Sequence, residues 1–170
     1  NSQKGVLQQI NYGAHGTGKS HTIKEETNEE DVIRITFHPD TDYSSFVGAY
    51  KPTTALLPIC DELGQPMKIG STVLHKEQIV YEFVAQSFLQ AYVNAWKKYD
   101  KDDKQYLVIE EIKRGNCAQI FGDLFQLLDR NDYGFSDYPI KADADMKRQL
   151  QKAFAGLAIE QSDKINSIYE

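Results

Sequence analysis

The sequence is poor in cysteine and histidine and has no long apolar run. Its 170 residues include 2 cysteines, Cys60 and Cys117, with no Cys-x-x-Cys pair and no histidine at metal-ligand spacing. This pattern predicts a reduced, cytoplasmic protein without disulfide bonds or structural zinc. The longest uncharged stretch that looks apolar, residues 85–96, is far shorter than the roughly 20 residues of a membrane-spanning helix, so we expect no membrane segment.

The sequence also has fewer positively charged than negatively charged residues. Lysine and arginine number 19 against 25 aspartates and glutamates, which gives a formal net charge of −6. Such a surface is a poor match for a phosphate backbone, so we expect any contact with DNA to come through other domains or a partner. The chain does not begin with methionine, and we expect it to be part of a longer protein.

What the sequence does contain is an alternation of apolar strand patterns and helical patterns. Such alternation is typical of an α/β fold with a parallel sheet, and the length suits a single domain. Residues 52–76 are proline-rich and show no period, so we expect an irregular insertion there. The mixed charges of residues 97–104 indicate a solvated turn. Strands are expected at 6–12, 31–37, 79–84 and 106–109, and helices at 19–30, 87–96, 116–129 and 146–154.

A glycine-rich loop lies between the first expected strand and the first expected helix. The loop matches the phosphate-binding pattern G-x-x-x-x-G-K-[ST] in the context that this pattern requires. Backbone N–H groups of such a loop surround a phosphate, Lys19 neutralises phosphate oxygens, and the Ser20 hydroxyl binds Mg²⁺. The predicted nucleotide-binding residues are Gly13, Ala14, His15, Gly16, Thr17, Gly18, Lys19, Ser20 and His21.

Two carboxylates follow the apolar strand 106–109. Glu110 and Glu111 are therefore expected at the carboxyl edge of the sheet, where open α/β folds bind ligands. Beside a P-loop, the first acid is expected to hold Mg²⁺ and the second to orient or deprotonate the attacking water. The sequence thus predicts Ser20 and Glu110 as metal ligands, with Glu111 and Lys19 as catalytic residues.

Three segments together resemble the McrB-type branch of the AAA+ NTPases, over roughly residues 9–140. They are the P-loop, the stretch Thr36–Pro52 with its F-H-P and Y-x-x-F-V-G motifs, and the stretch Ile109–Leu124. The members of this branch are motor subunits of modification-dependent restriction systems. The resemblance implies an AAA+ core with helices on both faces of a parallel sheet, Mg²⁺-dependent hydrolysis of ATP or GTP, a homo-oligomeric ring, a nuclease partner and DNA translocation.

The sequence departs from the family pattern at several points. His15 stands where the family often has proline, Glu110 where it usually has aspartate, and Lys113 where it has asparagine, whereas Arg114 matches. His38 ends the second expected strand within the family-specific stretch and is a further candidate near the nucleotide or a neighbouring subunit. The family's sensor strand, arginine finger and helical lid have no counterpart before Glu170. We therefore expect a partial domain, without its lid, that hydrolyses nucleotide weakly or not at all in isolation.

Two other functional classes stay open on the sequence. Glu110 in place of aspartate is compatible with a regulatory module that binds nucleotide without turnover. The chain length suits a small P-loop kinase, for which Lys147 and Arg148 are the available candidates for a basic lid.

Overall fold

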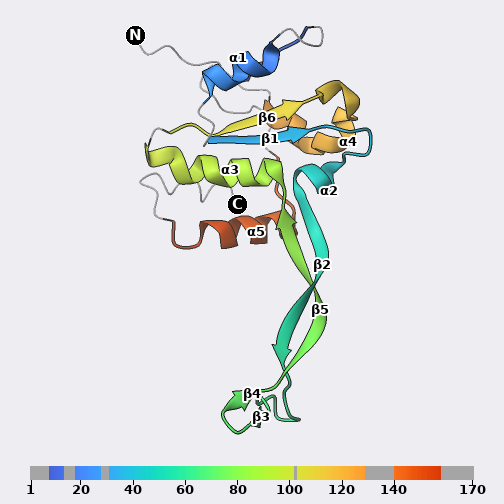
Figure 1. Ribbon diagram of the computed structural model, residues 1–170, viewed down its shortest axis with the longest axis vertical. Helices are drawn as coiled ribbons and strands as arrows, with labels where there is room; N and C mark the ends of the chain where they lie inside the picture. The colour runs from blue at the N-terminus through green and yellow to red at the C-terminus, as the bar shows by residue number, and fades with distance from the viewer. Residues whose placement is uncertain (1–7, 14–17, 28–30, 102, 129–139, 158–170) are drawn as a thin grey trace.

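A mixed α/β body with one long β-hairpin makes up the computed structural model, which describes residues 8–13, 18–27, 31–101, 103–128 and 140–157 (Figure 1). Helices and strands alternate along the body, and the hairpin extends away from it. The elements are, in chain order, α1 (Lys19–Glu26), β1 (Val32–Thr36), α2 (Tyr43–Phe46), β2 (Gly48–Pro58), β3 (Lys68–Ile69), β4 (Thr72–Val73), β5 (His75–Ala85), α3 (Ser87–Lys98), the 3₁₀ turn η2 (Tyr99–Lys101), β6 (Tyr106–Glu110), η3 (Ile112–Arg114), α4 (Cys117–Phe121), η4 (Gly122–Leu128) and α5 (Ala144–Phe154).

The body is built on a parallel pair of strands. β1 and β6 run in register from Val32 opposite Tyr106 to Thr36 opposite Glu110. Both strands are rich in β-branched and aromatic residues, which favour extended backbone. Parallel neighbours need a long crossover connection, and here α3 lies within it and contacts both strands. The strands expected at 31–37 and 106–109 are confirmed, and the second extends to include Glu110.

The strand expected at 6–12 is wrong for the residues that the structure describes. Residues 8–12 form no strand, and Ile10 and Tyr12 are 78% and 87% exposed. A strand needs a neighbour for its backbone hydrogen bonds, and no described strand lies alongside these residues. α1 lies on the side of the β1–β6 pair opposite α3 but buries none of its residues (Figure 1).

Aromatic side chains hold the body together. Phe37 and Phe46 are fully buried with ring centroids 5.4 Å apart, and Phe46 lies 5.1 Å from Phe121. Edge-on ring contacts of this kind stabilise a core beyond the burial of their area. The core thus joins the end of β1 to α2, α3, α4 and α5; its other buried members are Val47, Leu89, Ile120, Leu124, Met146, Leu150 and Phe154.

The helices expected at 87–96 and 146–154 are confirmed as α3 and α5. The helix expected at 116–129 is shorter than predicted. Gly122 adopts φ +51°, which ends α4 and leaves a 3₁₀ segment to continue to Leu128. No helix in the described part of the chain is long and apolar enough to cross a membrane.

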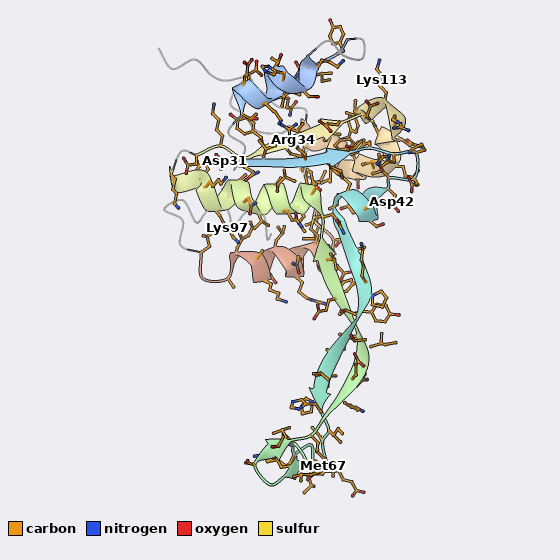
Figure 2. The ribbon with its side chains drawn as sticks, viewed as in Figure 1. Asp31, Arg34, Asp42, Met67, Lys97 and Lys113 are labelled. Carbon is orange, nitrogen blue, oxygen red and sulfur yellow. The ribbon has the colours of Figure 1, made fainter. Side chains whose placement is uncertain are left out.

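The irregular insertion expected at about 52–76 is a regular hairpin over most of its length. β2 and β5 pair antiparallel without interruption from Gly48 opposite Ala85 to Pro58 opposite His75. Prolines are tolerated because a proline at an edge strand can point its nitrogen outward, away from the ladder. We call residues 48–85 the hairpin arm; it reaches far from the body, and Met67 lies at its far end (Figure 2).

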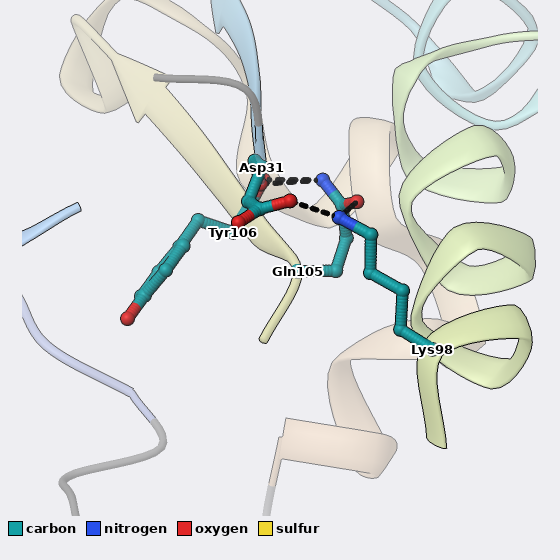
Figure 3. A network of polar contacts seen from close by, with 4 residues as sticks. All are labelled: Asp31, Lys98, Gln105 and Tyr106. Carbon is teal, nitrogen blue, oxygen red and sulfur yellow. Dashed lines mark hydrogen bonds and ion pairs between the residues drawn. The ribbon is translucent and has the colours of Figure 1, made fainter. Parts of the chain in front are cut away.

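The solvated turn expected at 97–104 is only partly correct. Lys98 forms an ion pair with Asp31 just before β1, and both side chains are about three-quarters buried. Gln105 donates to the Asp31 carbonyl oxygen at 2.7 Å and accepts from Lys98 at 3.2 Å (Figure 3). This network fastens the end of α3 to the starts of both parallel strands.

Candidate functional site

The structure describes the two ends of the P-loop, Gly13 and the start of α1. Gly18 precedes the helix with φ +80°, a left-handed conformation that glycine adopts without strain. The Lys19 ammonium donates to the Gly13 carbonyl oxygen at 2.9 Å, which ties the helix start to the first residue of the motif. The four residues between Gly13 and Gly18, namely Ala14, His15, Gly16 and Thr17, lie outside the described residues.

Ser20 and His21 occupy the exposed first turn of α1. The Gly18 carbonyl oxygen accepts from the backbone N–H groups of His21 and Thr22 at 2.9 and 3.0 Å, which is the hydrogen bonding of a regular helix start. The His21 ring lies 3.5 Å from Glu25, one turn further along α1. The imidazole is therefore directed along the helix surface, whereas the Ser20 hydroxyl remains accessible to solvent.

Glu110 lies at the carboxyl end of β6 and makes its contacts with β1. Its carboxylate is 3.6 Å from the Arg34 guanidinium and accepts from the Thr36 hydroxyl at 3.4 Å. Arg34 and Thr36 are two residues apart on β1, so both side chains point to the same face of the pair. The parallel register brings that face to Glu110, which leaves the carboxylate partly exposed and held from one side.

Glu111 has an unusual backbone. Its φ of +53° and ψ of +38° make it the one non-glycine residue with positive φ in the part of the chain that the structure describes. Its carbonyl oxygen accepts from the Arg114 N–H at 2.8 Å, which closes the 3₁₀ turn η3. Non-glycine residues in this region are strained and cluster at functional sites. The Glu111 side chain is exposed directly after the end of β6 at Glu110.

The structure therefore groups the predicted residues into two halves. Lys19 contacts Gly13 in the P-loop half, and Glu110 contacts β1 in the acidic half. Among the described residues, no cluster of three or more histidine, cysteine, aspartate or glutamate side chains is arranged to hold a metal ion.

Sequence reasoning missed the residues that hold Glu110. Arg34 and Thr36 have no motif of their own, and the signal for them is the i, i+2 spacing on β1 combined with the register to β6. Thr36 also lines a cavity of about 280 Å³ together with Ile35, His38, Asp40, Thr41 and Ser45. His38 is exposed there, and its backbone N–H donates to the Thr41 hydroxyl at 2.8 Å.

The remaining candidates lie elsewhere. Lys113 and Arg114 are exposed in η3 next to Glu111. Arg148, the basic candidate for a kinase lid, lies on α5 with its guanidinium 3.5 Å from the Tyr50 hydroxyl at the base of the hairpin arm. Tyr50 is on β2, so this contact joins Arg148 to the arm.

Comparison with known proteins gives one informative similarity. No family model matches the chain. The chain is similar to a component of a restriction enzyme: it is 38% identical over 155 aligned residues, 84% of this chain, to the Type II restriction enzyme BsuMI component YdiS of Bacillus subtilis (strain 168). This chain spans 43% of the length of that protein.

Proposed function

We propose that this chain is the P-loop part of a McrB-like AAA+ motor subunit of a restriction system, which binds and hydrolyses Mg²⁺-ATP or Mg²⁺-GTP. The observation that carries the proposal is the Lys19–Gly13 hydrogen bond, because it joins the first residue of the motif to the N-terminus of α1. A helix N-terminus with free N–H groups and a lysine beside it favours a phosphate. The similarity to a named restriction-enzyme component supports the role in restriction.

The donor set suits magnesium held by a nucleotide. Ser20 and Glu110 supply a hydroxyl and a carboxylate, and both are the hard oxygen ligands that Mg²⁺ binds. Magnesium in proteins commonly takes one or two protein ligands, with phosphates and water for the rest. When bound, the ion neutralises charge on the phosphates.

In this proposal Glu111 and Lys19 have different roles in hydrolysis. Glu111 accepts a proton from the attacking water or orients it, and its side chain is exposed directly after the end of β6. Lys19 leaves the Gly13 carbonyl and contacts phosphate oxygens. Assembly into a ring, a nuclease partner, and DNA contacts through other domains or that partner complete the proposed role and rest on the family resemblance.

A second candidate is nucleotide binding without turnover. The observation that favours it is the pair of contacts from Arg34 and Thr36 to Glu110, since both compete with a metal for the carboxylate. Single-turnover phosphate release by the full-length assembly separates the two candidates, because a pure binding module retains the triphosphate.

Thermal melting with Mg²⁺-ATP, Mg²⁺-GTP or neither tests the proposal. A ligand at 100 times its Kd stabilises the folded chain by about 2.7 kcal/mol, and we expect a shift of the melting temperature with at least one nucleotide. Lys19→Ala should abolish the shift. Lys24→Ala removes a positive charge from the other end of the same helix and should retain it. Cooperative melting with no shift for the unmodified chain would contradict the proposal.

A further inference from the structure

The hairpin arm has two chemically different faces. Residues opposite one another in an antiparallel ladder lie on the same face, and successive pairs alternate between faces. One face holds the pairs Tyr50–Phe83, Pro52–Tyr81, Thr54–Ile79 and Leu56–Glu77. We call it the apolar face. The other face carries the charged side chains Lys51, Glu82 and Lys76 together with Leu57 and the pairs Ala49–Val84, Thr53–Val80 and Ala55–Gln78.

The apolar face is uncovered. Leu56, Ile79 and Tyr81 are 71%, 66% and 70% exposed, and Tyr50 near the body is 39% exposed. Figure 2 shows the side chains of the arm projecting into open space below the body. A two-stranded hairpin is marginally stable by itself, and antiparallel sheets ordinarily cover their apolar face. We therefore expect another surface to cover the apolar face of the arm.

Nucleic acid does not suit this face. Pro52 and Pro58 remove donors from the outer edge of β2, which blunts that edge against pairing with another strand, whereas β5 contains no proline. The described strand residues of the apolar face include no lysine or arginine, so phosphates find no counter-charge there. An apolar protein surface is the complementary occupant.

The charges at the two ends of the apolar face complement a second copy of this chain. Arg148 lies beside Tyr50 at the body end, and Glu77 lies toward the tip. When two arms pack face to face and antiparallel, Arg148 of each copy faces Glu77 of the other, with apolar residues between them. The arm is twisted (Figure 1), and two ribbons of the same hand stay in contact by coiling around each other.

We propose that the apolar face of the hairpin arm is a homodimer contact, in which two copies pack antiparallel about a two-fold axis. Such a contact is self-complementary, as an isologous interface requires. The inference uses no residue of the P-loop or of the acidic strand end, so it stands or fails independently of the proposed nucleotide chemistry.

Sedimentation velocity of the nucleotide-free chain over a concentration series tests the proposal. We expect a reversible dimer. The double variant Leu56→Thr/Ile79→Thr should weaken it at least about 100-fold, because four apolar side chains leave the interface. The double variant Leu57→Thr/Val80→Thr changes the same two strands on the opposite face and should leave the dimer constant unchanged. A monomer at every concentration, or equal weakening by both double variants, would overturn the proposal.

Charge reversal tests the antiparallel arrangement. Glu77→Arg and Arg148→Glu should each weaken the dimer several-fold, and the combined variant should restore it, because opposite charges then face each other again. Circular dichroism checks that each variant keeps the fold. A combined variant as weak as the sum of the single effects would overturn the antiparallel pairing.

Discussion

Arg34 and Glu110 face each other across the parallel strands β1 and β6, with 3.6 Å between guanidinium and carboxylate. The contact joins a residue without a recognisable motif to the acid that sequence reasoning assigns to magnesium. Both side chains are partly exposed, so the pair is worth at most about 1 kcal/mol. An ion pair of this strength competes with a metal ion for the Glu110 carboxylate without preventing the ion from binding.

Arg34→Ala is predicted to lower the Mg²⁺ concentration needed for nucleotide-dependent stabilisation. Removing the guanidinium leaves Glu110 without a competing cation, and the midpoint of a Mg²⁺ titration followed by melting temperature should fall by about two- to fivefold. Arg34→Lys retains the charge and should keep the midpoint close to that of the unmodified chain. A higher midpoint in Arg34→Ala would mean that Arg34 presents Glu110 to the metal instead of competing with it.

Glu111→Gly is predicted to separate stability from hydrolysis. Glycine adopts the φ of +53° without the penalty of a Cβ atom, so the free energy of unfolding should rise by up to about 1 kcal/mol while turnover is lost. Glu111→Ala removes the same carboxylate but keeps the Cβ atom, and it should lose turnover without gaining stability. Urea denaturation of the chain measures stability, and phosphate release by the full-length assembly measures turnover. Identical stabilities of the two variants would argue against backbone strain at this position.

Asp42→Ala is predicted to destabilise the chain in a pH-dependent way. Asp42 caps α2 by accepting from the Ser44 hydroxyl and the Ser45 N–H, and these hydrogen bonds hold the pKa of its carboxyl below the usual value. Because the folded-state pKa is depressed, this stabilisation is present above the unfolded value of 3.8 and is lost as pH falls through the folded pKa. We expect a loss of about 1 kcal/mol near neutral pH that disappears in strong acid. Melting temperatures across the acid range measure it, and a constant difference would contradict the ionised cap.

Lys98→Met is predicted to destabilise the body by about 1–2 kcal/mol, because it leaves the partly buried Asp31 carboxylate without its cation. Lys97→Met alters the neighbouring, exposed position of α3 and should change the free energy of unfolding by no more than about 0.5 kcal/mol. Guanidinium chloride would screen the ion pair, so urea is the suitable denaturant. Equal effects of the two substitutions would show that the Asp31 network adds nothing.

Elements set by local sequence patterns could be predicted, whereas contacts between residues far apart in the chain could not. Strands β1 and β6 and helix α5 were predictable because each has a local apolar pattern, and Asp143 caps α5 through Met146 within four residues. In the hairpin arm the strand predicted at 79–84 is confirmed as part of β5, whereas β2 was not predicted, since prolines at 52 and 58 normally argue against a strand and only the pairing with β5 accommodates them. The Arg34–Glu110 contact spans two strands far apart in the chain, and it becomes visible only once their register is known.

The hairpin arm also bears on the order in which the chain folds. β1 and β6 are separated by a long stretch of sequence, and the arm occupies roughly half of it. When β2 and β5 zip together first, Gly48 and Ala85 become neighbours and the loop that the parallel pair must close is about halved. Each halving of a loop lowers its closure entropy by about 0.6 kcal/mol. Early arm formation therefore speeds assembly of the parallel pair, and substitutions that unzip the arm should slow refolding even though they lie far from the core.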